Sequence, residues 1–142
     1  MRPFTEILDN ENILFRLNDV SFTRVEDEPD GNNELIVDDS FEISEKQENM
    51  FGVKLSRHVF FAPAAFFDIR IEFEVGRCVL ENAEEKLTDY DLSKIITHSN
   101  VDEITCYNFN RASALIADLT SGFGLNPLIT PPVYSNNLVE SE

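Results

Sequence analysis

Four segments of this chain alternate between apolar and polar residues, and this pattern restricts the possible folds more than any other feature of the sequence. The segments span about residues 13–25, 34–44, 51–61 and 67–75. Alternation with a period of two is typical of β-strands that bury one face and expose the other to water. The sequence therefore predicts a four-stranded sheet with one apolar face.

Local breaks in the alternation indicate how the strands bend and connect. The pattern shifts by one residue near Asn18 and Asp19, which predicts a β-bulge or bend. A second shift is expected after Gly76, where Cys78, Val79 and Leu80 follow. The turn at residues 62–65 is short enough to force an antiparallel hairpin between the third and fourth segments.

The periodicity becomes helical in the last third of the chain. Residues 108–121 carry apolar side chains at helical spacing, and Gly122 is a natural end for this helix. A short helical segment is expected within residues 81–98. We therefore expect an α+β fold in a single domain over residues 1–142, in which one main helix and the short segment cover one face of a four-stranded antiparallel sheet.

The charge of the chain excludes some classes of partner. Asp and Glu number 27 against 11 Lys and Arg, and the net charge is −16. Nucleic acid and anionic membrane surfaces are therefore poor partners. The apolar fraction of 42% and the 12 Phe residues are too high for a disordered acidic chain. No apolar run is long enough for a signal peptide or a membrane span, so we expect no membrane insertion and a cytoplasmic location.

The sequence contains no recognisable catalytic or metal-binding motif. Its soft ligands are Cys78, Cys106, His58 and His98, and none of them forms a close-spaced pair. No glycine-rich phosphate loop opens a helix. We therefore expect no enzyme activity, no metal and no cofactor. A Cys–His pair formed only in three dimensions, as in a small Cys/His enzyme, stays open as an alternative.

The chain has more apolar side chains than one sheet and one helix are expected to bury. Residues 123–133 are strongly apolar, but their prolines prevent regular structure, so this loop must pack against something. Part of the surplus is ordinary core and a contact between copies of the chain. The rest predicts a groove for apolar polypeptide segments, and the acidic surroundings would favour basic or weakly charged ones.

Three sequence segments resemble the SecB family of protein-export chaperones. Residues 17–22, LNDVSF, are similar to the family's KDISFE strand. Residues 111–119, RASALIADL, are similar to its main helix, and residues 126–133, NPLITPPV, to the loop that ends in a PPVNF-like sequence. The order and spacing of these segments agree over about residues 13–134.

The resemblance implies a fold, an assembly and a function. SecB proteins are ATP-independent holdases that bind unfolded preproteins and assemble as dimers of dimers, with an eight-stranded sheet in each dimer. They deliver clients to the SecA ATPase through acidic positions, which Asp19 and Glu72 match here. The implied client groove places these residues together: Leu35, Val37, Phe41, Phe123, Leu125, Leu128 and Ile129.

The chain departs from the family pattern at two places. Thr23 stands where the family strand ends in Glu, and the sequence ends nine residues after Val133, where the family continues into a C-terminal helix. Both differences weaken the expected SecA contacts. Shortened SecB-like chains also include dedicated chaperones of toxin–antitoxin systems, so binding to a single partner such as an antitoxin is the alternative function.

Overall fold

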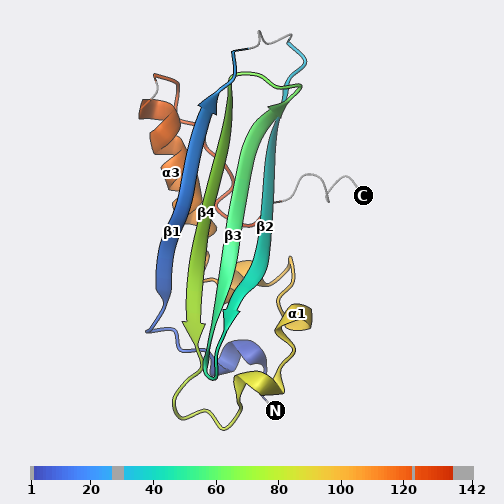
Figure 1. The fold of residues 1–142 in the computed structure, drawn as a ribbon, viewed down its shortest axis with the longest axis vertical. Helices are drawn as coiled ribbons and strands as arrows, with labels where there is room; N and C mark the ends of the chain where they lie inside the picture. The colour runs from blue at the N-terminus through green and yellow to red at the C-terminus, as the bar shows by residue number, and fades with distance from the viewer. Residues whose placement is uncertain (1, 27–30, 123, 136–142) are drawn as a thin grey trace.

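The computed structural model describes residues 2–26, 31–122 and 124–135. Its centre is one antiparallel sheet, in which long strands lie in the order β1-β4-β3-β2 (Figure 1). The four strands are β1 (Leu14–Arg24), β2 (Glu34–Lys46), β3 (Met50–Ala62) and β4 (Phe67–Cys78). The β3–β4 connection is a tight hairpin, as the sequence predicts.

The predicted irregularity in the first strand is a bulge at Asn18. Leu17 pairs with Phe73 and Asp19 with Glu72, so Asn18 is skipped in the backbone register between β1 and β4. The bulge returns Val20 to the apolar face, because one extra residue reverses the side to which later side chains point. The shift expected after Gly76 is wrong: the alternation continues, and Arg77 and Val79 both take buried positions.

The main helix is confirmed as α3 (Phe109–Gly122), which ends at the predicted glycine. The short helical segment expected within residues 81–98 is present in two pieces, η2 (Leu87–Asp89) and α1 (Leu92–Ile95). The remaining short helices are η1 (Phe4–Ile7) and α2 (Val101–Ile104). No helix among residues 2–26, 31–122 and 124–135 is long and apolar enough to cross a membrane.

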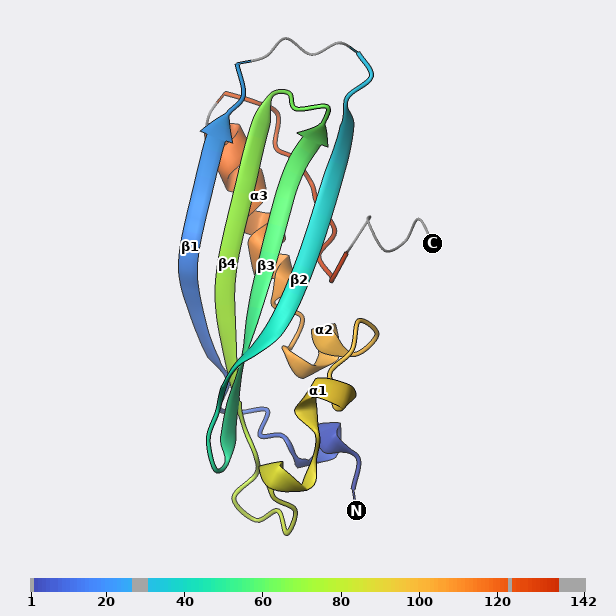
Figure 2. The same cartoon turned by 45° about the vertical axis from the view of Figure 1, so that its right-hand side comes forward.

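The sheet and the helices form two layers. Figures 1 and 2 show α3 behind β1 and β4, the 124–135 segment behind β3 and β2, and the short helices near the lower end of the sheet. The core lies between these layers, where strand residues such as Leu55, Ile69 and Phe73 meet Phe109 and Ile116 of α3. The expected α+β fold, with helices on one face of a four-stranded antiparallel sheet, is confirmed.

Candidate functional site

The apolar loop is tied to the sheet by a buried ion pair. Arg57 of β3 binds Asp39 of β2 through two hydrogen bonds of 2.8 and 2.6 Å. Its remaining donors reach the Thr130 hydroxyl at 3.1 Å and the carbonyl oxygens of Pro131 and Val133 at 2.5 and 2.9 Å. This cluster explains how a proline-rich segment without regular structure holds a defined position.

The helix α3 holds the same loop from the other side. Ser113 donates a hydrogen bond to the Thr130 carbonyl at 2.7 Å, and the backbone N–H of Leu128 donates to the buried Thr120 hydroxyl at 2.9 Å. The loop also closes one edge of the sheet, because the N–H of Asp39 donates to the Ser135 carbonyl. The edge of β2 is therefore covered at this point.

The structure places most of the client-groove residues predicted from the sequence along β2 and the loop. Leu35 and Leu125 are each 39% exposed, and Ile129 is 78% exposed. Val37 lies in the core, while Phe41 and Leu128 are half-buried against it. Phe123 lies outside the described residues. The predicted set is therefore divided between exposed and buried side chains.

The structure has an apolar groove beside α3, at a place that the sequence did not indicate. It has a volume of about 340 Å³ and is bounded by β1, β4 and α3. Its lining is mainly apolar with two charges from the helix: Phe15, Leu17, Ile71, Phe73, Arg111, Ala112, Ala114, Leu115 and Asp118. We call this cavity the β1–α3 groove. The sequence feature that could have indicated this groove is Leu17, an apolar residue on an edge strand.

One charged side chain shapes the wall of the β1–α3 groove. The guanidinium of Arg111 lies 4.3 Å from the centre of the Phe15 ring, a favourable cation–π arrangement. The aromatic rings of Phe15 and Phe73 are also in contact, with centres 5.4 Å apart. Leu17 is 47% exposed at the mouth. The groove therefore offers apolar contact area that neither the sheet nor the helix covers.

The two predicted SecA-contact residues lie side by side on the opposite, outer face of the sheet. Asp19 and Glu72 are cross-strand partners at the bulge. Both line a shallow depression of about 300 Å³, together with Asp38, His58 and Arg70. Three carboxylates thus lie close together, but Arg70 in the same depression and Lys54, 4.0 Å from Glu72, partly balance their charge.

Another carboxylate stabilises the outer face. Glu74 of β4 accepts hydrogen bonds from Asn18 and Arg16 of β1 and from Ser44 of β2. These bonds, that from Asn18 above all, hold the pKa of Glu74 below its usual range. The residue thus links both edge strands across the outer surface.

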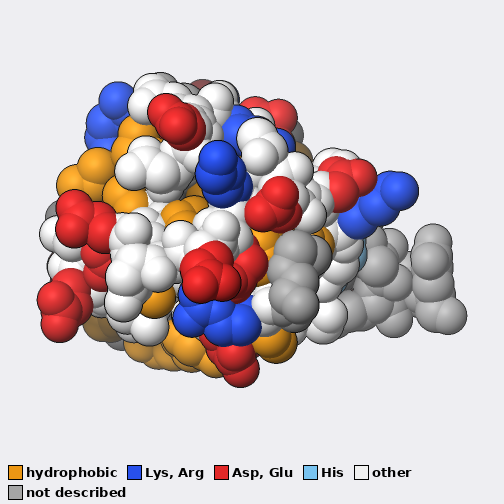
Figure 3. Space-filling model, turned by 90° about the horizontal axis from the view of Figure 1, so that it is seen from below, with side chains coloured by type: hydrophobic (Ala, Val, Ile, Leu, Met, Phe, Trp, Pro, Cys, Tyr) orange, Lys and Arg blue, Asp and Glu red, His pale blue; other side chains and the backbone are white. Residues whose placement is uncertain are grey.

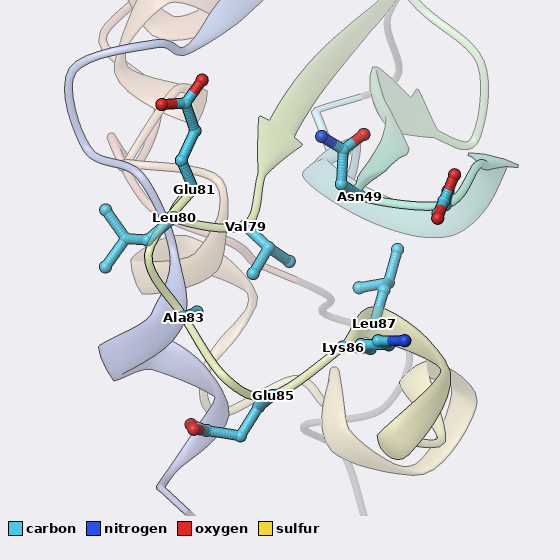
Figure 4. A pocket seen from close by; sticks show the side chains of 9 residues that line it. Asn49, Val79, Leu80, Glu81, Ala83, Glu85, Lys86 and Leu87 are labelled. Atoms are coloured by element: carbon cyan, nitrogen blue, oxygen red, sulfur yellow. The ribbon is translucent and has the colours of Figure 1, made fainter.

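Another cavity is a poor site for apolar ligands. It measures about 550 Å³ and lies between the β2–β3 turn and residues 79–87 (Figure 4). Glu48, Glu81, Glu85 and Lys86 contribute to its lining beside apolar side chains. Seen from this lower end, the surface shows acidic side chains scattered between apolar ones (Figure 3).

The histidines contact acidic and aromatic side chains, and the cysteines form no disulfide. His58 binds the Asp68 carboxylate at 3.0 Å, and His98 packs against Phe41 and Tyr134. No group of three or more His, Cys, Asp or Glu side chains within the described ranges could hold a metal ion. The two cysteines are free and partly exposed.

Comparisons with known proteins identify the fold. No family model matches the sequence, and no curated protein matches it. The structure is similar to the Rv1957 SecB-like chaperone of Mycobacterium tuberculosis, solved in complex with a ChAD peptide from the Rv1956 HigA1 antitoxin. The TM-score is 0.60 at 17% identity, over 84% of this chain and 87% of that one.

A second solved structure is less similar. It is a protein of unknown function from Streptococcus agalactiae, with a TM-score of 0.45 and 7% identity, over 84% of this chain and 97% of that one.

Proposed function

We propose that this protein, which has a SecB-like fold, is an ATP-independent holdase chaperone that binds unfolded polypeptide segments. The β1–α3 groove is the observation that carries the proposal, because it presents a mainly apolar lining between the sheet and α3. Aromatic and aliphatic side chains of a client would enter it. The proposed activity uses neither a catalytic residue nor a cofactor.

The exposed apolar residues of β2 and the loop extend the proposed client surface. Further segments of the same client would contact Leu35, Leu125 and Ile129. Phe123 belongs to the same predicted set but lies outside the described residues. Ordering a disordered client costs about 2–5 kcal/mol of the gross binding energy, so affinity has to come from many such contacts. The net charge of −16 favours basic or weakly charged segments.

The test is suppression of the aggregation of a chemically denatured protein, without nucleotide. Leu17→Asp places a charge at the mouth of the β1–α3 groove and should weaken client binding by about tenfold or more. Leu14→Asp is the matched control, because Leu14 lies on the same strand at the opposite parity and is 63% exposed. The proposal is wrong if the unmodified protein does not suppress aggregation, or if both variants bind clients equally well.

The structural neighbour favours a second candidate function, that of a dedicated chaperone for one antitoxin. The M. tuberculosis protein holds an antitoxin peptide. Under this alternative, the protein would bind one partner tightly and protect few unrelated proteins. A neighbouring gene for a toxin or an antitoxin would support it, and protection of many unrelated denatured proteins would argue against it.

We also propose that the protein delivers its clients to SecA. Asp19 and Glu72 would contact SecA through the outer face, and the protein would then act in the cytoplasm on preproteins. Reversing both charges, in Asp19→Lys with Glu72→Lys, should weaken SecA binding while client binding is kept. Unchanged binding of both SecA and client would exclude a SecA contact at these residues.

The proposed assembly is a homotetramer, a dimer of dimers with an eight-stranded sheet in each dimer. The edge of β1 is the better candidate for pairing, because Ser135 covers the edge of β2 at Asp39. Light scattering gives the mass of the particle. A tetramer would agree with the proposal, and a monomer would contradict it.

A further inference from the structure

Arg77 carries a buried charge with no carboxylate at ion-pair distance in the described part of the chain. Its relative exposure is 1%, and no carboxylate oxygen in residues 2–26, 31–122 and 124–135 forms an ion pair with it. Arg57, the other fully buried arginine on this face, has such a partner in Asp39. A buried cation is costly unless an anionic or polar group compensates it.

The neighbours of Arg77 are neutral oxygens and one sulfur. Its guanidinium donates to the Ile104 carbonyl at 2.5 Å, to Oδ1 of Asn10 at 2.6 Å and to Sγ of Cys106 at 3.2 Å. Its Nε has no hydrogen-bond partner within the described part of the chain. Burial lowers the pKa of Arg77 from its ordinary value. The Asp9 carboxylate acts on this cation from beyond ion-pair distance, so within the described residues the ionisable group in direct contact with Arg77 is the Cys106 thiol.

Cys106 is placed to use this cation. The residue is partly exposed in the turn between α2 and α3. An adjacent guanidinium stabilises the negative charge that develops on sulfur as it attacks an electrophile. Cys78 is also free and partly exposed, and the charge of Arg77 acts on both thiols, but Arg77 donates a hydrogen bond to Cys106. Comparing the two thiols therefore measures the effect of this direct contact.

We propose that Cys106 is a reversible oxidation site that hydrogen peroxide converts to a sulfenic acid, with Arg77 as its positioning residue. The sulfur attacks one peroxide oxygen, so that an S–O bond forms and the O–O bond breaks. The leaving hydroxide takes up the thiol proton and becomes water. Sulfur loses two electrons and the peroxide gains them. This inference is independent of the proposed chaperone function.

The experiment follows both cysteines in the same molecule. The full chain is treated with hydrogen peroxide and dimedone, which traps sulfenic acid, and each cysteine peptide is quantified by mass spectrometry. Cys106 should react about tenfold faster than Cys78 in the folded protein, and the two rates should become similar in urea. Equal rates in the folded protein, or a faster Cys78, overturn the proposal.

Variants at Arg77 separate its effect from simple exposure of the sulfur. Arg77→Met should bring the Cys106 rate close to that of Cys78, while Arg77→Lys keeps a cation and should restore part of the difference. Circular dichroism establishes which variants are folded. A folded Arg77→Met that keeps the full difference excludes a role for the guanidinium. If Arg77→Met does not fold, the comparison of folded and urea-unfolded wild type still decides whether Cys106 is selectively reactive.

Discussion

Arg57 and Asp39 form a two-point ion pair on the buried face of the sheet, and neither side chain is accessible to water. They are direct cross-strand partners in β3 and β2. Because the other guanidinium donors hold the carbonyls of Pro131 and Val133, the pair also fixes the loop. The position of a segment far away in sequence therefore depends on two charges in the core.

Removing one member of this pair should be strongly destabilising. Arg57→Met leaves the Asp39 carboxylate buried without its partner, and we expect the free energy of unfolding to fall by about 3–5 kcal/mol. Arg57→Met combined with Asp39→Leu removes both charges, so the free energy of unfolding should fall by less than in Arg57→Met alone. Urea unfolding of both variants measures the difference. A single variant within about 1 kcal/mol of wild type would show that the pair contributes little.

The connection between α3 and the loop allows a more local test. Thr120 donates its hydroxyl to the Ile116 carbonyl and accepts the N–H of Leu128. Thr120→Val replaces the hydroxyl with a methyl group and keeps the shape of the side chain. It should lower the free energy of unfolding by about 1 kcal/mol and speed amide exchange at Leu128. Thr120→Ser keeps the hydroxyl and is the control. Unchanged exchange at Leu128 would argue that this bond does not hold the loop.

The strands and the main helix could be predicted because their local patterns agree with the tertiary structure. Alternating residues of β3 and β4 do face the core, and the pattern shift near Asn18 is a real bulge. The helical stripe of residues 108–121 corresponds to α3. Periodicity was sufficient here because burial of an apolar face determines these elements.

The buried charges could not be predicted in the same way. Asp39, Arg57 and Arg77 stand at inward positions of their strands, where charged side chains are rarely found. For Asp39 and Arg57, the sequence did offer an indication, because opposite charges at inward positions of β2 and β3 can form an ion pair. The loop conformation depends on hydrogen bonds with residues far away in sequence, and no local propensity specifies such contacts.

The β1–α3 groove was missed because it forms between elements that are distant in sequence. Phe15 and Leu17 belong to β1, whereas Leu115 and Arg111 belong to α3. Their side chains fitted the sheet and helix patterns, which predict a face but not how completely a neighbour covers it. In this case α3 does not fully cover β1, and Leu17 stays half-exposed.

The close approach of β1 to β4 leads to a prediction at Gly76. A Cβ atom at this position would lie 3.3 Å from Cβ of Leu14, which cannot rotate away because it is attached to the backbone. Gly76→Ala should therefore push the strands apart and cost about 1 kcal/mol or more. Gly122→Ala is the control, since no atom lies within 4 Å of its added Cβ. Equal unfolding midpoints in urea would contradict the expected clash.

The depressed pKa of Glu74 gives a pH dependence with a definite sign. Hydrogen bonds from Asn18, Ser44 and Arg16 favour the ionised carboxylate, so the folded-state pKa lies below the ordinary value of 4.5. Its contribution to stability is present above pH 4.5 and is lost as the pH falls through the folded value. Asn18→Ala should raise the pKa of Glu74, as followed by NMR titration, and should reduce this acid-dependent loss. The effect should be below about 1 kcal/mol because the site is on the surface. If the pKa in Asn18→Ala equals that of the wild type, Asn18 is not the main cause of the shift.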